Sequence, residues 1–585
     1  MTRLPVAIET VEADVAIVGS GAAGLMAAIH ALKVDPRLRV VMVSKGIVAR
    51  SGCSVMVQGY NAAIDPADSV ESHFADTVRN GEFLNDQELA WQVTSRAPEI
   101  LRWLETDIGC FFDRLPDGRI EQVPFGAQSF PRKVHRGDHT GMEIVSRLRD
   151  RLLRLPVIEL PDTRALDLLP GGEGGVAGVV ALDWRRGVPL IVLAPVVIVA
   201  TGGAATMFRI ATPAREKTGD GLAMCARAGL PLRDLEMVQF LSVGILAGES
   251  RMTGVLLEEA MRYAGAHLLN ARGERFMERY DAEKMERAPR DIVVRACYAE
   301  ITAGRGTEAG GVVLDLRHLG AETVRARFGH MVERAWRATM RDLTRETVEI
   351  GPAAHIQIGG VVIDAQGQTE LPGLLVAGED GGGTHGASWL GGNGIAESTV
   401  MGAQVGEHSA RVTRSRGPIP SLARPAVEAY AADRLAVAFG HLRGGSAAHH
   451  PHDVTRRLQT IMWREVGLLR SARGLREAAA VVDDLRDRLR QMSAAGPVAS
   501  NMSWQEILDL ENQLIVARLM IAAARARAET RGMHVRADFP QRDDRAWLRT
   551  VLVRYDDGEA VIETLPVEMT RLRPQDPVAD SALSA

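Results

Sequence analysis

The sequence predicts an α/β protein with an α+β insertion, followed by a helical bundle and a small C-terminal domain. Three observations support this fold class: a strand, glycine turn and helix within residues 13–45, two later strands that end in glycine at 202 and 378, and helical periodicity from 453 onward. The chain has 585 residues, which is too long for one hydrophobic core and suggests about three or four domains at a prior of roughly 150 residues each.

The composition is that of an ordinary globular protein and excludes several function classes. Hydrophobic residues make up 46% and charged residues 24%, which argues against disorder, collagen and coiled coil. The net charge of -5 predicts no nucleic-acid surface. The four cysteines are far apart without a Cys-x-x-Cys pattern, so we expect no metal site or iron–sulfur cluster in this chain. So few cysteines also indicate a protein of the reducing cytoplasm. The apolar run 188–200 is broken by Pro195, which predicts two buried strands rather than a transmembrane segment.

The first glycine turn predicts a dinucleotide phosphate site. GSGAAG lies between an apolar strand and a helix, and RVVMVSK forms the next strand. Gly19 allows the tight turn, Gly21 lets a pyrophosphate approach the backbone, and Gly24 lets the helix pack on the sheet. The strand–turn–helix context favours this interpretation over an ordinary glycine-rich turn.

Later segments favour FAD over NAD. An NAD site places an acid at the end of the second strand, where this chain has Ser44-Lys45. Two further strands end at Thr201-Gly202-Gly203 and at Gly378-Glu379. Widely separated segments that converge on one dinucleotide suit a large two-part cofactor and imply an inserted domain.

The remaining chain completes the predicted organisation. Helical patterns cover 453–470, 472–494 and 503–532, and strand-like runs cover 547–555 and 560–564. The expected domains are an FAD-binding domain at 1–240 and 350–417, a capping domain at 241–349, a helical domain at 418–532 and a small C-terminal domain at 533–585.

Ordered sequence blocks along nearly the whole chain resemble a known family. They include GSGAAGLMAA, TGDGLAMCARAGLPLRDLEMVQF, APRDIVVRA, HIQIGGVVID, GLLVAGEDGGGTHGASWLGGNGIAES and ETRGMHVRADFPQRDD. These blocks are similar to the flavoprotein subunits of succinate dehydrogenase and fumarate reductase, with L-aspartate oxidase and the adenylylsulfate reductase flavoprotein as relatives. The resemblance implies a Rossmann-like FAD-binding domain interrupted by a mobile capping domain.

The resemblance also implies a set of FAD-binding residues. Asp220 and Glu379 belong to this set, although each could instead cap a helix. The whole set is Gly19, Ser20, Gly21, Ala22, Ala23, Gly24, Ser44, Lys45, Ser51, Gly52, Ser54, Gly59, Thr201, Gly202, Gly203, Asp220, Glu379, Gly394 and Ile395.

The flavin attachment differs from that of the respiratory members, which link FAD covalently through a histidine. Here Cys53 lies near that position, and a small buried cysteine is the commoner role for such a residue. We therefore expect non-covalent FAD.

Two catalytic residues are implied by the resemblance. Arg290, in a Pro-Arg-Asp triplet, matches the family's proton-transfer group, and His355 matches a histidine that holds a substrate carboxylate. An arginine is a poor base but can donate a proton and stabilise developing negative charge. The alternatives are an ion pair between Arg290 and Asp291, and a structural role for His355.

The predicted substrate pocket departs from the family at several positions. Leu241 replaces a histidine, Glu258-Glu259 precedes an alanine where the family has Thr-Glu-Gly, and Trp389 replaces an arginine. Burying a carboxylate without its paired charge costs several kcal/mol. We therefore expect poor turnover of succinate and fumarate. The alternative is a local shift of alignment in which Arg262 supplies the missing charge.

The main functional hypothesis is an oxidoreductase that acts on a C–C bond beside an anionic group of a small molecule. Its electrons would pass to an iron–sulfur subunit or a quinone, at the inner membrane through a partner. Two alternatives remain open at this point: oxidation of a C–N bond or sulfur chemistry, and a flavin-bearing subunit without catalysis. Oligomerisation is also left open.

Overall fold

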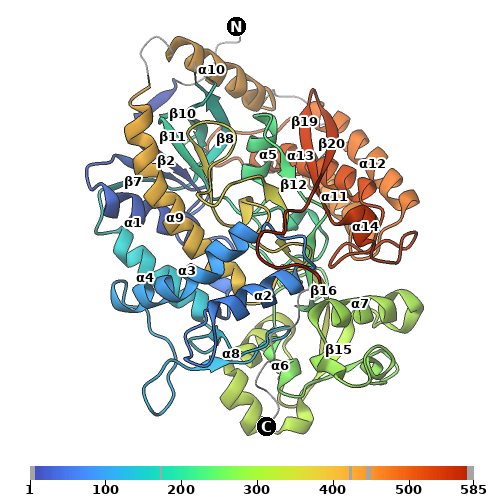
Figure 1. Cartoon of the computed structure of the whole chain (residues 1–585). Coiled ribbons are helices and arrows are strands. Elements are labelled where there is room, and N and C mark those ends of the chain that lie inside the picture. The colour runs from blue at the N-terminus through green and yellow to red at the C-terminus, as the bar shows by residue number, and fades with distance from the viewer. Residues whose placement is uncertain (1–6, 172–173, 258, 420–423, 443–449, 576–585) are drawn as a thin grey trace.

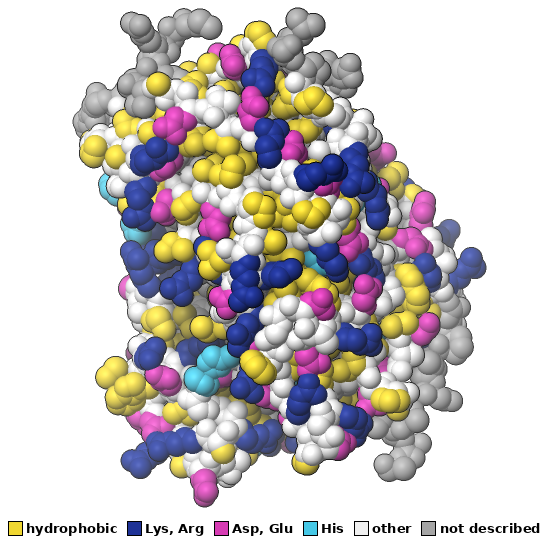
Figure 2. All heavy atoms as spheres, turned by 90° about the vertical axis from the view of Figure 1, so that its left-hand side faces the viewer, with side chains coloured by type: hydrophobic (Ala, Val, Ile, Leu, Met, Phe, Trp, Pro, Cys, Tyr) yellow, Lys and Arg dark blue, Asp and Glu magenta, His cyan; other side chains and the backbone are white. Residues whose placement is uncertain are grey.

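The computed structural model describes residues 7–171, 174–257, 259–419, 424–442 and 450–575 (Figure 1). On the face shown in Figure 2, basic and acidic side chains are interspersed with each other and with hydrophobic ones. Among the described residues, no helix is both long enough and apolar enough to cross a membrane.

A five-stranded parallel sheet organises the N-terminal part of the chain. Its strands lie in the order β18 (Leu374–Val376), β11 (Val196–Val199), β2 (Val15–Val18), β3 (Val40–Val43) and β7 (Val157–Leu160). The strands β2, β3 and β11 are runs of buried, mostly β-branched residues, as expected for a parallel sheet covered on both faces.

Several helices pack around this sheet. The helix α1 (Ala22–Val34) connects β2 to β3, and α9 (Asn393–Arg416) packs against α1. The other elements of this part are β4 (Tyr60–Asn61), α2 (Val70–Asn80), α3 (Gln87–Thr106), β5 (Gln122–Val123), β6 (Lys133–Val134), α4 (Thr140–Leu152) and α5 (Asp220–Arg227).

A second sheet confirms the interpretation of the apolar run. Its order is β1 (Glu9–Glu12), β10 (Val188–Leu193), β9 (Val176–Asp183) and β8 (Thr163–Pro170). The run 188–200 divides into β10 and β11 with Pro195 between them, so it forms two buried strands that belong to different sheets.

Residues 241–349, called the capping segment below, have a hydrophobic cluster of their own. Buried side chains from Leu241 to Ile350 form this cluster, apart from the large core around the sheets. An antiparallel sheet joins β13 (Val238–Ile245), β16 (Val348–Gln357), β15 (Val312–Asp315) and β14 (His267–Leu269). The helices are α6 (Ala260–Tyr263), α7 (Arg290–Glu300) and α8 (Ala321–Thr339).

The C-terminal part contains the three predicted helices and the predicted strands, together with two helices that the sequence analysis did not single out. The helices are α10 (Arg424–Gly440), α11 (Pro451–Glu465), α12 (Ala472–Arg490) and α13 (Met502–Ala526), and α14 (Asp544–Trp547) precedes the strands. The apolar residues of α10 to α13 join the same core as the parallel sheet. A hairpin of β19 (Arg549–Asp556) and β20 (Glu559–Pro566) extends a sheet begun by β12 (Leu232–Arg233) and β17 (Gly360–Val361). The exact domain boundaries stay predictions.

Candidate active site

A large cavity lies where the parallel strands end. The segments that follow β2, β11 and β18 line it, and so do residues of the capping segment. Ligands in open α/β sheets bind at this carboxyl edge. The cavity encloses about 1680 Å³ of space between atoms, part of it open to solvent. Its lining extends from the glycine turn to the capping segment, which suits a large cofactor beside a substrate.

The first glycine turn forms one wall of the cavity. Gly19 has a φ of +111°, and a Cβ there would lie 2.0 Å from the Ala200 carbonyl oxygen. Gly21 precedes α1, and the first turn of that helix contains no acidic side chain. The positive end of the helix dipole therefore faces the cavity without a competing carboxylate, which suits a phosphate group.

Nearly all of the predicted FAD-binding residues are brought together here. Gly24 and Gly203 do not line the cavity: a Cβ on Gly24 would meet the Gly19 carbonyl oxygen, and one on Gly203 would meet Glu379. The residues that do line it are Gly19, Ser20, Gly21, Ala22, Ala23, Ser44, Lys45, Ser51, Gly52, Ser54, Gly59, Thr201, Gly202, Asp220, Glu379, Gly394 and Ile395.

The two predicted acids are held by lysines rather than by helix caps. Asp220 begins α5, but its carboxylate accepts from Lys45 Nζ at 3.0 Å and from Asn512 Nδ2 at 2.8 Å. Burial alone would raise the pKa of Asp220, yet Lys45 and Arg164 bring it well below the usual value. Glu379 forms an ion pair with Lys217 and accepts a hydrogen bond from the backbone N–H of Gln357 at 2.8 Å.

Two cavity lysines were not predicted. The chain has only five lysines among its 69 basic residues, and Lys45, Lys133 and Lys217 all line the cavity. Lys133 lies with its stem against Gly59 and its Nζ 4.9 Å from the centre of the Phe125 ring. The scarcity of lysine in an arginine-rich chain was the sequence signal that could have identified them.

Arg290 is the first residue of α7 and faces the cavity between aromatic rings. Its guanidinium carbon is 4.6 Å from the centre of the Trp389 ring and 5.6 Å from that of Phe125. Its Nε donates to Glu259 Oε2 at 2.8 Å. The alternative pairing of Arg290 with Asp291 is wrong, because Asp291 pairs with Arg295 instead.

Glu259 connects Arg290 to a second arginine. Its Oε1 accepts from Arg262 Nη2 at 3.0 Å. Burial would raise the pKa of Glu259, but Arg290 and Arg262 lower it to about 2, so the carboxylate stays ionised. Arg262 itself is buried, does not line the cavity and donates to the Glu286 carbonyl oxygen. The alternative in which Arg262 supplies a charge to the substrate is therefore wrong.

His355 is a neutral polar group in the cavity wall. It lies on β16, and its Nδ1 is 2.6 Å from Thr212 Oγ1. Burial, with Lys217 and Arg290 nearby, lowers the pKa of His355 to about 3. Its ring centre is 5.5 Å from that of Trp389. His355 and Arg290 thus face one part of the cavity, where a substrate could contact both.

The other predicted pocket residues give this part an apolar wall. Leu241 and Trp389 line the cavity together with Leu256, and Glu259 lies beside them. Glu258 lies outside the described residues. Among the described side chains, buried Trp389 Nε1 has no hydrogen-bond partner, so its N–H is available to a ligand.

The cavity fits FAD on three counts. Its lining comes from widely separated segments, as a two-part cofactor requires, its glycine turn and helix end suit a pyrophosphate, and a buried polar atom in its wall has no partner. Of the described side chains, His385 Nδ1 is such an atom. These features define an α/β protein that binds a dinucleotide.

Comparisons with known proteins establish the cofactor and the family. Residues 14–395 match a family described as "FAD binding domain", and 455–579 match "Fumarate reductase flavoprotein C-term". A fumarate reductase (CoM/CoB) polypeptide of Methanothermobacter marburgensis is 38% identical over 93% of this chain and 97% of that protein. The chain belongs to the succinate dehydrogenase and fumarate reductase flavoprotein family and is an FAD-dependent oxidoreductase.

Solved structures agree with the fold. A chain of E. coli quinol fumarate reductase superposes with a TM-score of 0.92 at 30% identity, covering 97% of this chain and 99% of that chain. Adenylylsulfate reductase from Archaeoglobus fulgidus has a TM-score of 0.77 at 19% identity, covering 97% and 98%, and shares the fold alone.

Proposed function

We propose that the protein is a dehydrogenase or reductase that acts on a C–C bond next to the anionic group of a small organic molecule other than succinate or fumarate. The observation that supports this most directly is the pairing of Arg290 with ionised Glu259 at the cavity wall. In this proposal, Arg290 is the proton donor, Glu259 is its charged partner, and neutral His355 lines the same cavity.

The residues of the cavity suggest how such a substrate is held. Bound FAD supplies the two-electron chemistry. With Thr212 Oγ1 donating to Nδ1, neutral His355 carries its proton on Nε2 and can donate it to a carboxylate. Lys133 adds a positive charge on the Phe125 side of the cavity. Leu241 and Trp389 favour an apolar or flat portion of the substrate on the remaining wall.

Arg290 transfers the proton in this proposal. Donation of a guanidinium proton to a substrate carbon requires that the proton be replaced. The hydrogen bonds from Arg290 through Glu259 to Arg262 form a path for that replacement. Glu259 also holds the guanidinium in one orientation, which matters because proton transfer requires a short, directed contact.

Replacing Arg290 tests the reaction. Dye-coupled turnover of a panel of unsaturated and saturated organic anions should fall at least about 100-fold in Arg290→Ala, the lower end of the usual general acid–base contribution. Arg295→Ala is the matched control, because Arg295 lies on the same helix and pairs with Asp291. Unchanged turnover in Arg290→Ala contradicts the mechanism, and rapid turnover of succinate or fumarate by the wild type contradicts the substrate class.

We also propose that electrons are exchanged with an iron–sulfur subunit or a quinone at the membrane. The support comes from the names of similar proteins, which include "flavoprotein subunit" and "quinol fumarate reductase". Purification from the native host under mild conditions, followed by iron analysis and quinol oxidation, tests this. A chain that purifies alone and reduces oxygen to hydrogen peroxide at its full rate contradicts it and favours oxidase chemistry on a C–N bond.

Sulfur chemistry on a nucleotide substrate has less support. It would use Trp389 as a stacking surface for a heteroaromatic ring, but the Arg290 guanidinium already lies over that indole.

A further inference from the structure

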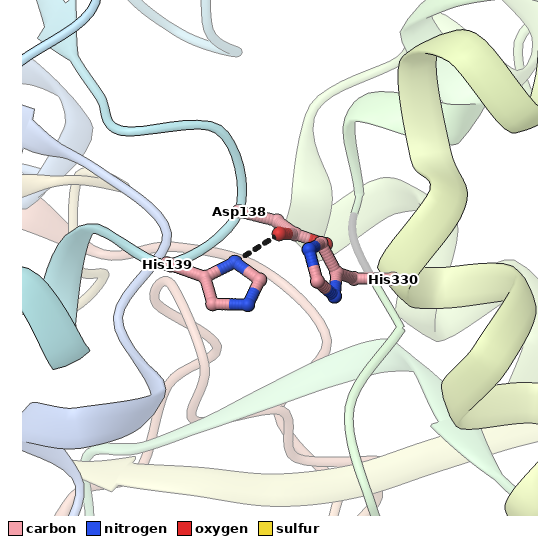
Figure 3. A group of neighbouring side chains, drawn as sticks. All are labelled: Asp138, His139 and His330. Atoms are coloured by element: carbon pink, nitrogen blue, oxygen red, sulfur yellow. Dashed lines mark hydrogen bonds and ion pairs between the residues drawn. The ribbon is translucent and has the colours of Figure 1, made fainter.

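We propose that Asp138, His139 and His330 form a binding site for a divalent transition metal of the Zn²⁺ type, which links the capping segment to the FAD-binding part. Each residue offers one ligand atom, and these atoms all lie within 4.8 Å of one another. Figure 3 shows one Asp138 carboxylate oxygen directed at His139, with the His330 imidazole beside both. The proposal departs from the sequence-based expectation of no metal site, which was based on the cysteine pattern, because this site contains no cysteine.

The donor set matches this class of metal. Two imidazoles and one carboxylate are borderline ligands that Zn²⁺ accepts with a water at the fourth position. Among the described side chains, Asp138 Oδ2 is buried without a hydrogen-bond partner, while Oδ1 is 2.5 Å from His139 Nδ1. A buried carboxylate oxygen without a partner is costly, and a cation would satisfy it.

The two sides of the site are fixed by different elements. Asp138 and His139 end the turn that leads into α4, where the His139 amide donates to the Arg136 carbonyl oxygen at 2.9 Å. His330 lies on α8, two residues after a break in helical geometry at Phe328, and its ring is exposed. Tetrahedral zinc needs ligand atoms about 3.4 Å apart, whereas Asp138 Oδ1 and His139 Nδ1 are only 2.5 Å apart. Asp138 would therefore bind through its unpartnered Oδ2, and small rotations of the His139 and His330 rings would complete the site.

A metal at this position would join the capping segment to the FAD-binding part. His139 and His330 touch across the junction, with ring centres 3.8 Å apart. The capping segment also carries Arg290 and Glu259 into the cavity. A metal bound on both sides would therefore hold these residues against the FAD-binding part and slow substrate exchange. The binding site itself is independent of the proposed reaction, and only this last effect depends on it.

Metal binding to the FAD-loaded full-length protein tests the site. After treatment with a chelator, calorimetric titration with Zn²⁺ should show one site, and Co²⁺ should add a visible ligand-field band. Affinity for Zn²⁺ should fall at least about tenfold in His330→Ala and in Asp138→Asn. His452→Ala is the matched control, because His452 is a 58%-exposed histidine on α11. Equal Zn²⁺ affinity in wild type and His330→Ala, or no binding by the wild type, overturns the proposal.

A second measurement separates linkage from binding alone. Zn²⁺ should slow proteolysis of the capping segment in the wild type and leave His330→Ala unaffected. Because His330 is exposed on a helix, this variant should keep the wild-type melting temperature, which excludes misfolding as the cause. Zn²⁺ binding with no change in proteolysis would overturn the link between the two parts.

Discussion

Both Nε and Nη2 of Arg290 donate to the same oxygen of Glu259, Oε2. The other carboxylate oxygen accepts from Arg262. Glu259 is therefore a buried anion between two guanidinium groups. A change that removes its charge or moves its carboxylate would leave two cations in a low-dielectric site without a compensating anion. This relationship makes Glu259 a positioning residue for Arg290.

Glu259→Gln should lower turnover without much change in substrate binding. The amide cannot accept from both arginines as a carboxylate does, so Arg290 loses its orientation and its route for reprotonation. We expect kcat to fall about 100-fold with KM within about threefold. Glu283→Gln, an exposed change in the same segment, is the control. A kcat equal to that of the wild type would mean that Arg290 needs no partner.

Trp389→Phe should weaken substrate binding while retaining the reaction. Phenylalanine keeps an aromatic face for Arg290 but lacks the indole N–H, which has no protein partner among the described residues. One neutral hydrogen bond contributes about 0.5–1.5 kcal/mol, so KM should rise about 2- to 12-fold with kcat nearly unchanged. Trp336→Phe, on the exposed face of α8, should leave both constants unchanged. An unchanged KM in Trp389→Phe would show that the indole N–H does not contact the substrate.

The sequence identified the parts of the site that carry glycine motifs and missed those that do not. The glycine turn at 19–24 and the strand ends near 202 and 378 are local features, so their convergence on the sheet edge was predictable. Phe125 and Lys133 reach the cavity through loops and the short strand β6, where no periodicity or motif indicates a position. Their placement depends on tertiary contacts that no local pattern encodes.

The fold shows the same division between local and non-local features. The helices after 450 and the hairpin after 547 were predicted from periodicity, which is a local signal. The pairing of β19 with β12 joins residues more than 300 positions apart and could not be derived from the sequence pattern. The resemblance supplied the order of domains, while the details of contact came only from the structure.

Acid precipitation should release the flavin. Cys53 Sγ lies 3.1 Å from Lys217 Nζ, but burial raises the pKa of the Cys53 thiol and disfavours the thiolate that would attack a flavin. We expect the FAD absorbance in the supernatant for the wild type and for Cys53→Ser, with equal FAD content before precipitation. A yellow pellet that becomes colourless in Cys53→Ser would instead demonstrate a covalent bond.

Gly19→Ala should abolish FAD retention, whereas Gly52→Ala should not. Both glycines have positive φ, +111° and +92°, so each substitution carries backbone strain of about 1 kcal/mol or more. Only at Gly19 would the new Cβ also lie 2.0 Å from a backbone oxygen, that of Ala200; at Gly52 nothing lies within 4 Å. FAD content after gel filtration and the melting temperature measure the difference. Equal FAD loss in the two variants would show that strain, and not the close contact, decides binding.

The free energy of unfolding should fall as the pH drops below about 6.5. Burial lowers the pKa of His73 to about 4, that of His355 to about 3, and that of His534 well below its usual value. The unfolded chain binds protons at these histidines from about pH 6.5 downward while the folded chain does not, so their contribution is complete above that pH and is lost on acidification.

Buried acids work in the opposite direction, and burial raises the pKa of both Glu236 and Asp380. Burial raises the pKa of Asp380 to about 7, so below that pH the folded chain holds a proton that the unfolded chain releases until about pH 4. This opposes the effect of the histidines in part, and the free energy of unfolding should still fall between pH 6.5 and 5.5. Urea unfolding at pH 7 and 5.5 measures this loss. It should become smaller in His73→Gln and stay unchanged in His452→Gln, and a protein more stable at pH 5.5 would contradict the assignment of neutral buried histidines.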